Sequence, residues 1–427
     1  MMKSDKQLKP LGEIANIVMG LSPKGDTYNK NGVGDPLLNG PTEFGARHPT
    51  PTLFTTDPSR FAKPGDILFC VRGSTTGRMN WADRQYAIGR GIAAVSAKTD
   101  STDTYFIYSC IRHTLDRILA LTSGSVFPSL STGDFNAYPI AWPDQNVRHG
   151  IVHILRSLDD KIELNRRMNR TLERMAQAVF KSWFIDFDPV HAKADGRDTG
   201  LPNHIAALFP DTFQDSELGQ IPEGWSAKPL DEIVHINPTR KLAKGTIAPF
   251  LEMSNMPTKG PSPASWRLRA MGSGMKFVNG DTLVARITPC LENGKTAFVD
   301  FLQGSEVGWG STEYIVLRPV DTIPPVFAYL LARSEEFRGF AIPQMTGSSG
   351  RQRIPPKSLH KYQLASPDIG SPVFQAIGEL VQPFFTRIRA SMNQNRRLAG
   401  LRDTLLPKLL SGELEVPEAE ELIEDLI

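Results

Sequence analysis

Loops rich in basic, amide and hydroxyl side chains are the part of this sequence whose residue types could do chemistry. They fall around residues 24–47 and 72–78 in the first half of the chain, and around 240–259, 286–288 and 346–353 in the second. Arginine and lysine pair with phosphate, arginine suits a guanine edge, asparagine suits adenine, and glycine lets backbone amides approach a phosphate. These loops therefore predict contacts to a nucleic acid rather than bond-making chemistry.

The candidate DNA-binding side chains share these donor types and occur at matching places in the two halves. In the first half they are Lys24, Asn29, Lys30, Thr42, Arg47, Arg72, Ser74, Thr75, Arg78 and Ser125. In the second half they are Arg240, Lys241, Lys244, Asn255, Arg286, Thr288, Ser348, Arg351 and Arg353.

The motifs of common enzyme classes are missing from the sequence. The stretch at residues 73–77 lacks the lysine of a phosphate-binding loop, and there is no GxGxxG after a strand, no HExxH, no GxSxG and no paired CxxC. The Asn237–Arg240 stretch does not supply the Asn/Asp-Pro-Pro-aromatic loop of adenine methylation. His149 and His153 are four residues apart but lack a nearby third ligand, which favours a solvated helix face. We expect a binding protein with no catalytic residue and no metal.

The chain repeats itself after about half its length. Residues 9–14 (KPLGEI) return as 228–233 (KPLDEI), and the Gly65-Asp66-x-Leu68 motif returns at Gly280. A chain of 427 residues also exceeds the size at which one core usually keeps growing. We therefore predict two similar globular units of mixed α/β (α+β) structure, related by internal duplication in a pseudo-twofold arrangement.

A long helix is expected after each unit. Apolar and small residues recur at alternating spacings of three and four, and the same pattern returns 226 residues later without a gap. The seam positions are Leu155, Leu158, Ile162, Asn165, Asn169, Leu172, Ala176 and Val179 in the first helix, and Val381, Phe384, Ile388, Ser391, Asn395, Leu398, Arg402 and Leu405 in the second. This heptad pattern predicts an antiparallel coiled coil, with Asn169 and Asn395 fixing its register. Two independent amphipathic helices are the alternative.

The helix ends carry clusters that we expect to dock a partner. Phe180, Trp183 and Phe184 lie just beyond the narrow seam, where little core is expected to cover them. Leu405 and Leu409 near the end of the second helix are assigned the same role.

Charge and cysteine usage bound the class of protein. The net charge is only +2, but the tail from residue 411 to 427 holds seven acidic residues and no basic one, so the body is more basic than the total suggests. Three cysteines form no CxxC pair, which indicates reduced, buried thiols and a cytoplasmic protein. No apolar stretch is long enough to span a membrane.

The predicted organisation follows from these patterns. Residues 1–145 form recognition unit 1, 146–188 the central helix, 189–218 a linker, 219–370 recognition unit 2, 371–411 the C-terminal helix and 412–427 an acidic tail.

Three stretches carry a family resemblance over nearly the whole chain: residues 172–189 (LERMAQAVFKSWFIDFDP), 218–225 (LGQIPEGW) and 401–414 (LRDTLLPKLLSGEL). With them the chain resembles the specificity subunit of type I restriction–modification systems. The N-terminal unit departs from the pattern, because it lacks the Ile-Pro-Glu-Gly-Trp lead-in that opens the second unit.

The resemblance implies two target-recognition domains that each read half of a bipartite DNA sequence, and helices that separate them. It also implies docking of two DNA-methyltransferase subunits and two restriction (motor) subunits in a host-defence complex. S-adenosylmethionine, ATP and Mg would then belong to those partners, and this chain would bind no cofactor. Two other readings stay open: an enzyme with unrecognised motifs, and a coiled-coil adaptor without a nucleic-acid role.

Overall fold

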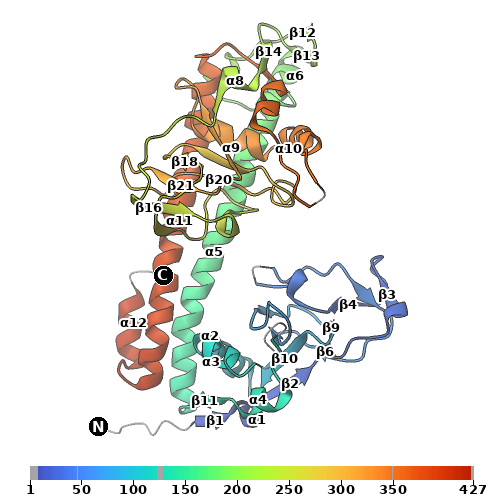
Figure 1. Ribbon diagram of the computed structural model, residues 1–427, viewed down its shortest axis with the longest axis vertical. Helices are drawn as coiled ribbons and strands as arrows, with labels where there is room; N and C mark the ends of the chain where they lie inside the picture. Colours follow the sequence, from blue (N-terminus) through green and yellow to red (C-terminus); the bar gives the residue numbers. More distant parts are fainter. Residues whose placement is uncertain (1–7, 46, 123–127, 349, 425–427) are drawn as a thin grey trace. The chain divides into compact units, whose positions relative to one another are not determined.

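The computed structural model describes residues 8–45, 47–122, 128–348 and 350–424. The chain divides into two compact units (Figure 1). Unit 1 comprises Met1–Ile162 and Arg396–Ile427, and unit 2 comprises Glu163–Asn395.

Unit 1 is built on a four-stranded antiparallel sheet in the order β2-β10-β7-β8 and a five-stranded sheet in the order β3-β5-β4-β9-β6, in which β4 and β9 are parallel. The strands of the first sheet are β2 (Ala15–Met19), β10 (Ile92–Ala97), β7 (Ile67–Cys70) and β8 (Met79–Trp81). Those of the second are β3 (Tyr28–Asn29), β5 (Phe54–Thr55), β4 (Asp35–Leu38), β9 (Tyr86–Ile88) and β6 (Phe61–Ala62). The remaining elements are β1 (Leu8–Pro10), β11 (Pro139–Ala141), α1 (Leu11–Ile14), α2 (Ser101–His113), α3 (Leu115–Leu119) and α4 (Thr132–Ala137).

Unit 2 repeats this topology, with sheets in the orders β15-β22-β19-β20 and β17-β16-β21-β18 and with β16 parallel to β21. Its strands are β12 (Phe213–Ser216), β13 (Gly219–Pro222), β14 (Ser226–Pro229), β15 (Val234–Ile236), β16 (Ile247–Leu251), β17 (Arg267–Ala270), β18 (Lys276–Phe277), β19 (Thr282–Ala285), β20 (Thr296–Phe298), β21 (Gly308–Gly310), β22 (Tyr314–Pro319) and β23 (Gln363–Ser366). Its helices include α8 (Leu230–Ile233), α9 (Val326–Arg333) and α10 (Glu335–Ala341). The predicted duplication and mixed fold are confirmed.

The repeated Gly-Asp motif is a turn that starts the central strand of each unit. Gly65 has a φ of 88° and Gly280 one of 87°, a left-handed conformation that glycine adopts without strain. The carboxylate of Asp66 accepts a hydrogen bond from the Lys63 amide, and that of Asp281 accepts one from the Val278 amide, both at 2.8 Å. Burial raises the pKa of both aspartates, although these bonds work against it. The motif therefore recurs for a structural reason.

Two 40-residue helices, α5 (Gln145–Phe184) and α11 (Pro372–Ser411), contribute to both units. Within each unit they pack against each other in antiparallel directions (Figure 1): Asp159 pairs with Arg402 in unit 1, and Asn165 bonds Asn395 in unit 2. The predicted seam is thereby confirmed, because an apolar stripe of period 3.5 keeps facing its partner helix.

Asn169 and Asn395 are both buried at the seam, as expected from its pattern, but their amides are engaged unequally. Asn165 donates from Nδ2 to Asn395 Oδ1 at 2.9 Å and to Gln394 Oε1 at 2.8 Å. Asn169 is buried, and neither of its side-chain amide atoms has a hydrogen-bond partner among the described residues. The inter-helix amide bond therefore joins Asn395 to Asn165, and the role of Asn169 in setting the register stays a prediction.

The aromatic docking prediction is corrected as well. Phe180, Trp183 and Phe184 are each no more than 2 % exposed and belong to the core of unit 2. The ring centroid of Phe184 lies 5.1 Å from that of Phe327. The chain folds back after α5 through α6 (Asp188–Ala194) and α7 (Asn203–Ala206), and residues from this segment complete the core. The rings stabilise the fold and are not open to a partner.

Leu405 and Leu409 are buried in the same way in unit 1. They pack in one cluster with Ala419 and Ile423 of α12 (Val416–Glu424), which folds back after α11. The segment expected as a simple acidic tail therefore includes a helix with a buried apolar side, and the docking role of these two leucines is corrected too.

The three cysteines are free thiols; Cys70 and Cys110 are buried, while Cys290 is half-buried. Across the described ranges, none of the helices combines the length and the apolar character needed to cross a bilayer.

Candidate nucleic-acid interface

In unit 1, the loop after β7 contacts the segment that leads to β11. In unit 2, the loop after β19 contacts the segment that leads to β23 in the same way. In unit 1 the amide of Leu130 donates to the carbonyl of Val71 at 3.0 Å, and the backbones of Arg72 and Ser129 form an isolated antiparallel β-bridge. In unit 2 the amide of Ile354 donates to the carbonyl of Arg286 at 2.9 Å, and Ile287 forms a bridge with Arg353. The fold thus brings two predicted loops together at the same place in both units.

These backbone contacts show which residues of the two loops occupy equivalent positions. Val71 takes the place of Arg286, and Arg72 takes the place of Ile287. Successive residues of an extended chain point to opposite sides, so the two arginines differ in direction. Arg72 is exposed, whereas Arg286 is half-buried and its Nε has no partner among the described residues.

Most of the predicted side chains are accessible to solvent. Exposed are Lys24, Lys30, Thr42, Arg72, Ser74 and Arg78 of unit 1, and Lys241, Lys244, Ser348 and Arg351 of unit 2. Half-buried are Asn29, Arg47, Thr75, Arg240, Asn255, Arg286, Thr288 and Arg353. Ser125 lies outside the described residues.

Three of the predicted arginines are engaged by carboxylates of their own unit. The ion-pair distances are 3.1 Å for Arg47 and Asp160, 3.0 Å for Arg240 and Asp281, and 2.8 Å for Arg353 and Glu313. A guanidinium that already has a carboxylate partner must lose it to bind a phosphate or a base. Arg72, Arg78 and Arg351 have no such partner in the described parts of the chain, so they are the better candidates.

Two other candidates also have internal partners. The Asn29 side chain donates to the Val33 carbonyl and accepts from the amides of Asn31 and Val33, which shapes its own loop. The hydroxyl of Thr288 donates to the carbonyl of Gln352 at 3.2 Å and helps to join the two loops of unit 2.

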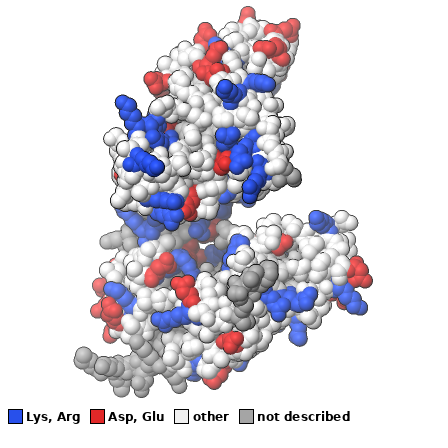
Figure 2. Space-filling model, in the orientation of Figure 1, with Lys and Arg blue, Asp and Glu red and all other residues white. Residues whose placement is uncertain are grey.

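Sequence reasoning missed two arginines of β17, Arg267 and Arg269. Both are exposed, and the guanidinium carbon of Arg269 lies 4.8 Å from the ring centroid of Phe250. Basic side chains form several groups on the face of unit 2 drawn in Figure 2. The alternation of basic and other residues in Arg267–Ala270 is the signal that could have found this strand.

A buried ion pair fixes the start of α5 to α2 in unit 1. Arg148 donates from Nε and Nη2 to the two carboxylate oxygens of Asp103, at 2.7 and 2.8 Å, and its guanidinium carbon lies 4.0 Å from the Trp142 ring centroid. Asp100, Asp103 and His149 also bring ligand atoms within 4.8 Å of one another. Because Arg148 already bonds both carboxylate oxygens of Asp103, we interpret these three residues as part of the ion pair rather than as a metal site.

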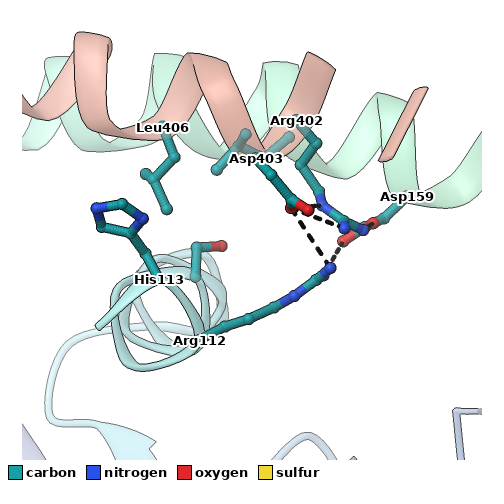
Figure 3. Close-up of a pocket in the computed structure, with 8 residues that line it drawn as sticks. Arg112, His113, Asp159, Arg402, Asp403 and Leu406 are labelled. Carbon is teal, nitrogen blue, oxygen red and sulfur yellow. Dashed lines mark hydrogen bonds and ion pairs between the residues drawn. The ribbon is translucent and has the colours of Figure 1, made fainter. Parts of the chain in front are cut away.

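A pocket of about 220 Å³ lies in unit 1 between α2, α5 and α11 (Figure 3). Arg112 of α2 reaches toward Asp159 and Asp403, at 4.0 and 3.5 Å, and Arg402 of α11 pairs with the same two carboxylates. The Tyr105 hydroxyl donates to Asp159 at 2.5 Å. Two arginines thus pair with two aspartates. The cluster joins α2 to α5 and α11, and its net charge is too small to attract a charged ligand.

Comparison with known proteins gives a family match over the first part of the chain. Residues 3–174 match the family described as type I restriction modification DNA specificity domain. The putative type I restriction enzyme MjaX specificity subunit of Methanocaldococcus jannaschii is 32 % identical over 163 residues, a match that spans 38 % of this chain and 38 % of that protein.

Two further similarities extend along most of the chain. The type I restriction enzyme HindI specificity subunit of Haemophilus influenzae is 23 % identical over 408 residues, covering 82 % of this chain and 87 % of that protein. A crystal structure of a type I restriction–modification system S subunit from M. genitalium has a TM-score of 0.53 at 16 % identity, covering 94 % of this chain and 95 % of that chain. The fold is the same in outline.

Proposed function

We propose that this chain, a relative of type I restriction–modification specificity subunits in sequence and fold, is the non-catalytic subunit that selects the DNA target of such a complex. Unit 1 reads one half of a bipartite target, and unit 2 reads the other. The helices α5 and α11 set the length of the unread spacer and dock methyltransferase subunits. The complex works in the cytoplasm, where its DNA substrate is.

The observation that supports this proposal is one scaffold occurring twice with different exposed side chains. Both units have the same order of strands and the same paired loops. At those loops unit 1 presents Arg72 and Arg78, while unit 2 presents Arg351. Phosphate contacts position a protein on DNA, and base contacts select the sequence. Two domains that recognise different half-sites need the same backbone scaffold with different side chains at the DNA-contacting positions.

The docking surface is reassigned to the outer side of α5, because the rings first predicted to dock are buried. Leu164 is 56 % exposed and Met175 is 47 % exposed, and both lie in unit 2. They fall on a stripe that also holds Met168, Thr171 and Ala178, at spacings of four, three, four and three residues. This spacing forms a second heptad-like seam, the kind of surface that packs against a helix of another chain.

The chemistry of the complex is assigned to the partners. Two methyltransferase subunits bind S-adenosylmethionine and methylate adenine, and two motor subunits use ATP and Mg. Within unit 1, the charges around the Figure 3 pocket and the carboxylate of Asp103 are already engaged by partners of their own chain.

Methylation mapping tests the proposal. The chain is expressed with its methyltransferase partner, and host DNA is sequenced for modified adenines. The expected result is a split motif of two short defined halves around a fixed gap. An assembled and active methyltransferase without any sequence preference would overturn the proposal and favour the adaptor alternative. S-adenosylmethionine binding or DNA modification by the purified chain alone would instead favour the enzyme alternative.

A further inference from the structure

The ribbon formed by β16 and β17 joins a largely buried strand, β16, to an exposed one, β17. The two strands are antiparallel, with Ala248 opposite Arg269 and Phe250 opposite Arg267, and β17 is the edge strand of its sheet. All four residues of β17 are exposed to solvent. An edge strand with this much accessible surface is free to contact another molecule.

Arg269 is held in place without being neutralised. Its guanidinium carbon lies 4.8 Å from the Phe250 ring centroid and 5.7 Å from that of Trp309, and the Trp309 indole donates to its backbone carbonyl at 3.2 Å. No carboxylate pairs with Arg269 in the described part of the chain, whereas Arg267 pairs with Glu252. A stacked arginine loses little freedom on binding and keeps its planar donors available for a two-point hydrogen bond.

The other side of β17 is apolar and exposed, although Pro249, opposite Leu268 on β16, is buried. Ile247 is 70 % exposed and Leu268 is 69 % exposed. They sit on the same side because Ile247 pairs with Ala270, two residues along from Leu268. Large apolar side chains held together on an exposed ribbon indicate a contact surface, and apolar side chains contact the thymine methyl in the major groove.

The charges around the ribbon favour a nucleic acid over an apolar protein surface. Lys241 and Lys244 are exposed on the neighbouring loop. That loop is joined to the end of the ribbon by two backbone bonds of 2.8 Å, from the Gly245 amide to the Met271 carbonyl and from the Met271 amide to the Thr246 carbonyl. Lysines beside an exposed edge strand are placed to contact phosphates while the side chains of β17 reach base edges in the major groove.

Unit 1 has a different ribbon at the equivalent place. There β5 has only two residues, Phe54 and Thr55, and its outer side is covered by β3. The strands that carry the ribbons, β4 and β16, nevertheless make the same parallel pairing, with β9 and β21 respectively. The copies therefore keep the frame and differ at the exposed edge, as expected where two units read different bases.

We propose that the β16–β17 ribbon is a base-reading element of unit 2, that Arg269 selects a guanine through its planar fork, and that Leu268 contacts apolar groove surface. This inference rests on the proposed function and extends it to a specificity-determining residue that sequence reasoning did not identify.

The test uses the whole chain in complex with its methyltransferase and a library of targets in which each half-site position is varied. Arg269→Ala is expected to lower methylation of the preferred target on the order of 5- to 150-fold relative to its competitors and to relax one position of one half-site. Arg269→Lys keeps the charge and the aliphatic cover over Phe250 but loses the fork, so it should relax the same position. Leu268→Thr should change preference at a neighbouring position.

Arg197→Ala, an exposed arginine of unit 2 outside the ribbon, is the matched control and should leave the map unchanged. If the parent complex reads a split target and both Arg269 variants read it with unchanged preference, the ribbon proposal is wrong while the proposed function stands. If the variants lose methyltransferase association instead, the ribbon binds protein. A parent complex without sequence preference would mean that the proposed function itself fails.

Discussion

Buried charge makes the Arg148–Asp103 pair a sensitive point of unit 1. Both side chains are nearly inaccessible, and both carboxylate oxygens of Asp103 accept from Arg148. Removing the cation leaves a buried, uncompensated carboxylate, so Arg148→Ala should lower the free energy of unfolding by about 3–5 kcal/mol. Chemical unfolding of the full chain measures this. Arg156→Ala, a neighbouring arginine near Tyr105 without this buried partner, is the control. An equal loss in both variants would contradict the argument.

The same pair predicts how stability depends on pH. Burial alone would raise the pKa of Asp103, but hydrogen bonds from Arg148 and Thr99 outweigh it and hold the pKa below its ordinary value of 3.8. The stabilisation is therefore complete above the pKa of the unfolded chain and is lost as pH falls from 3.8 through the folded-state pKa. In Asp103→Asn this acid-sensitive part should disappear from a plot of melting temperature against pH. A plot that keeps its full acid slope would assign the effect to other groups.

Exposed and engaged arginines of unit 2 should respond differently to substitution. Arg351→Ala should weaken DNA binding with little loss of stability: by about 1–3 kcal/mol at one base position if it reads a base, or alike for all sequences with a flatter salt slope if it contacts phosphate. Arg353→Ala should mainly lower the melting temperature, because it leaves Glu313 without its partner. Binding titrations at several salt concentrations and thermal unfolding separate the two. If Arg351→Ala and Arg353→Ala lost DNA affinity equally and had the same melting temperature, the distinction between free and ion-paired arginines would be wrong.

Residue types alone could not make that distinction. The sequence indicates that the loops hold arginines, and the structure agrees that most candidates are accessible. Which guanidinium has a carboxylate partner depends on residues far away in the chain, such as Glu313 for Arg353 and Asp160 for Arg47. Arg269 was overlooked because its aromatic supports, Phe250 and Trp309, are distant in sequence and meet only in the folded sheet.

At the scale of the elements, the outer stripe of α5 and its aromatic end should separate docking from folding. Leu164→Asp and Met175→Asp should lower association with the methyltransferase at unchanged melting temperature, because both side chains are exposed. Trp183→Ala should instead destabilise unit 2 by about 3–5 kcal/mol, because it empties a core position. Co-purification and thermal unfolding of the same variants give both readouts. Full association of the two aspartate variants would refute the docking surface.

The unpartnered amide of Asn169 predicts a gain in stability on substitution. Asn169→Leu removes a buried polar group that has no hydrogen-bond partner in the described residues, so the free energy of unfolding should rise by about 1 kcal/mol. Asn165→Leu should have the opposite sign, because it deprives Asn395 of its partner. Chemical unfolding of the two variants compares them directly. A loss in Asn169→Leu would mean that the amide has a stabilising role that its surroundings do not explain.

The elements also differ in how far the sequence predicts them. The helices and their antiparallel seam follow from a heptad pattern sustained over this length, which favours a coiled coil. The burial of Trp183 and Leu409 was not predictable in the same way, since it depends on α6 and α12 folding back over the helix ends. Such packing is a tertiary contact, and no local pattern encodes it.

At the scale of the whole molecule, exchange of one recognition unit should change one half of the target. The exchange is best made at residue 145, where α5 begins, with residues 1–145 replaced by those of a relative. Unit 1 packs its α2 on α5 through Asp103 and Tyr105, so the incoming segment must supply an acid for Arg148 and a hydroxyl for Asp159. A segment that lacked this acid and this hydroxyl would destabilise unit 1, and its DNA recognition could then not be tested.

With those contacts kept, methylation mapping should show a new first half-site, an unchanged second half-site and an unchanged gap, because α5, α11 and unit 2 are retained. Exchange of residues 219–370 is the reciprocal control and should change only the other half. A change in both halves after one exchange would mean that the units do not read independently. A changed gap would mean that the spacer depends on the recognition units rather than on the helices, whose 40-residue lengths are the same in every exchange.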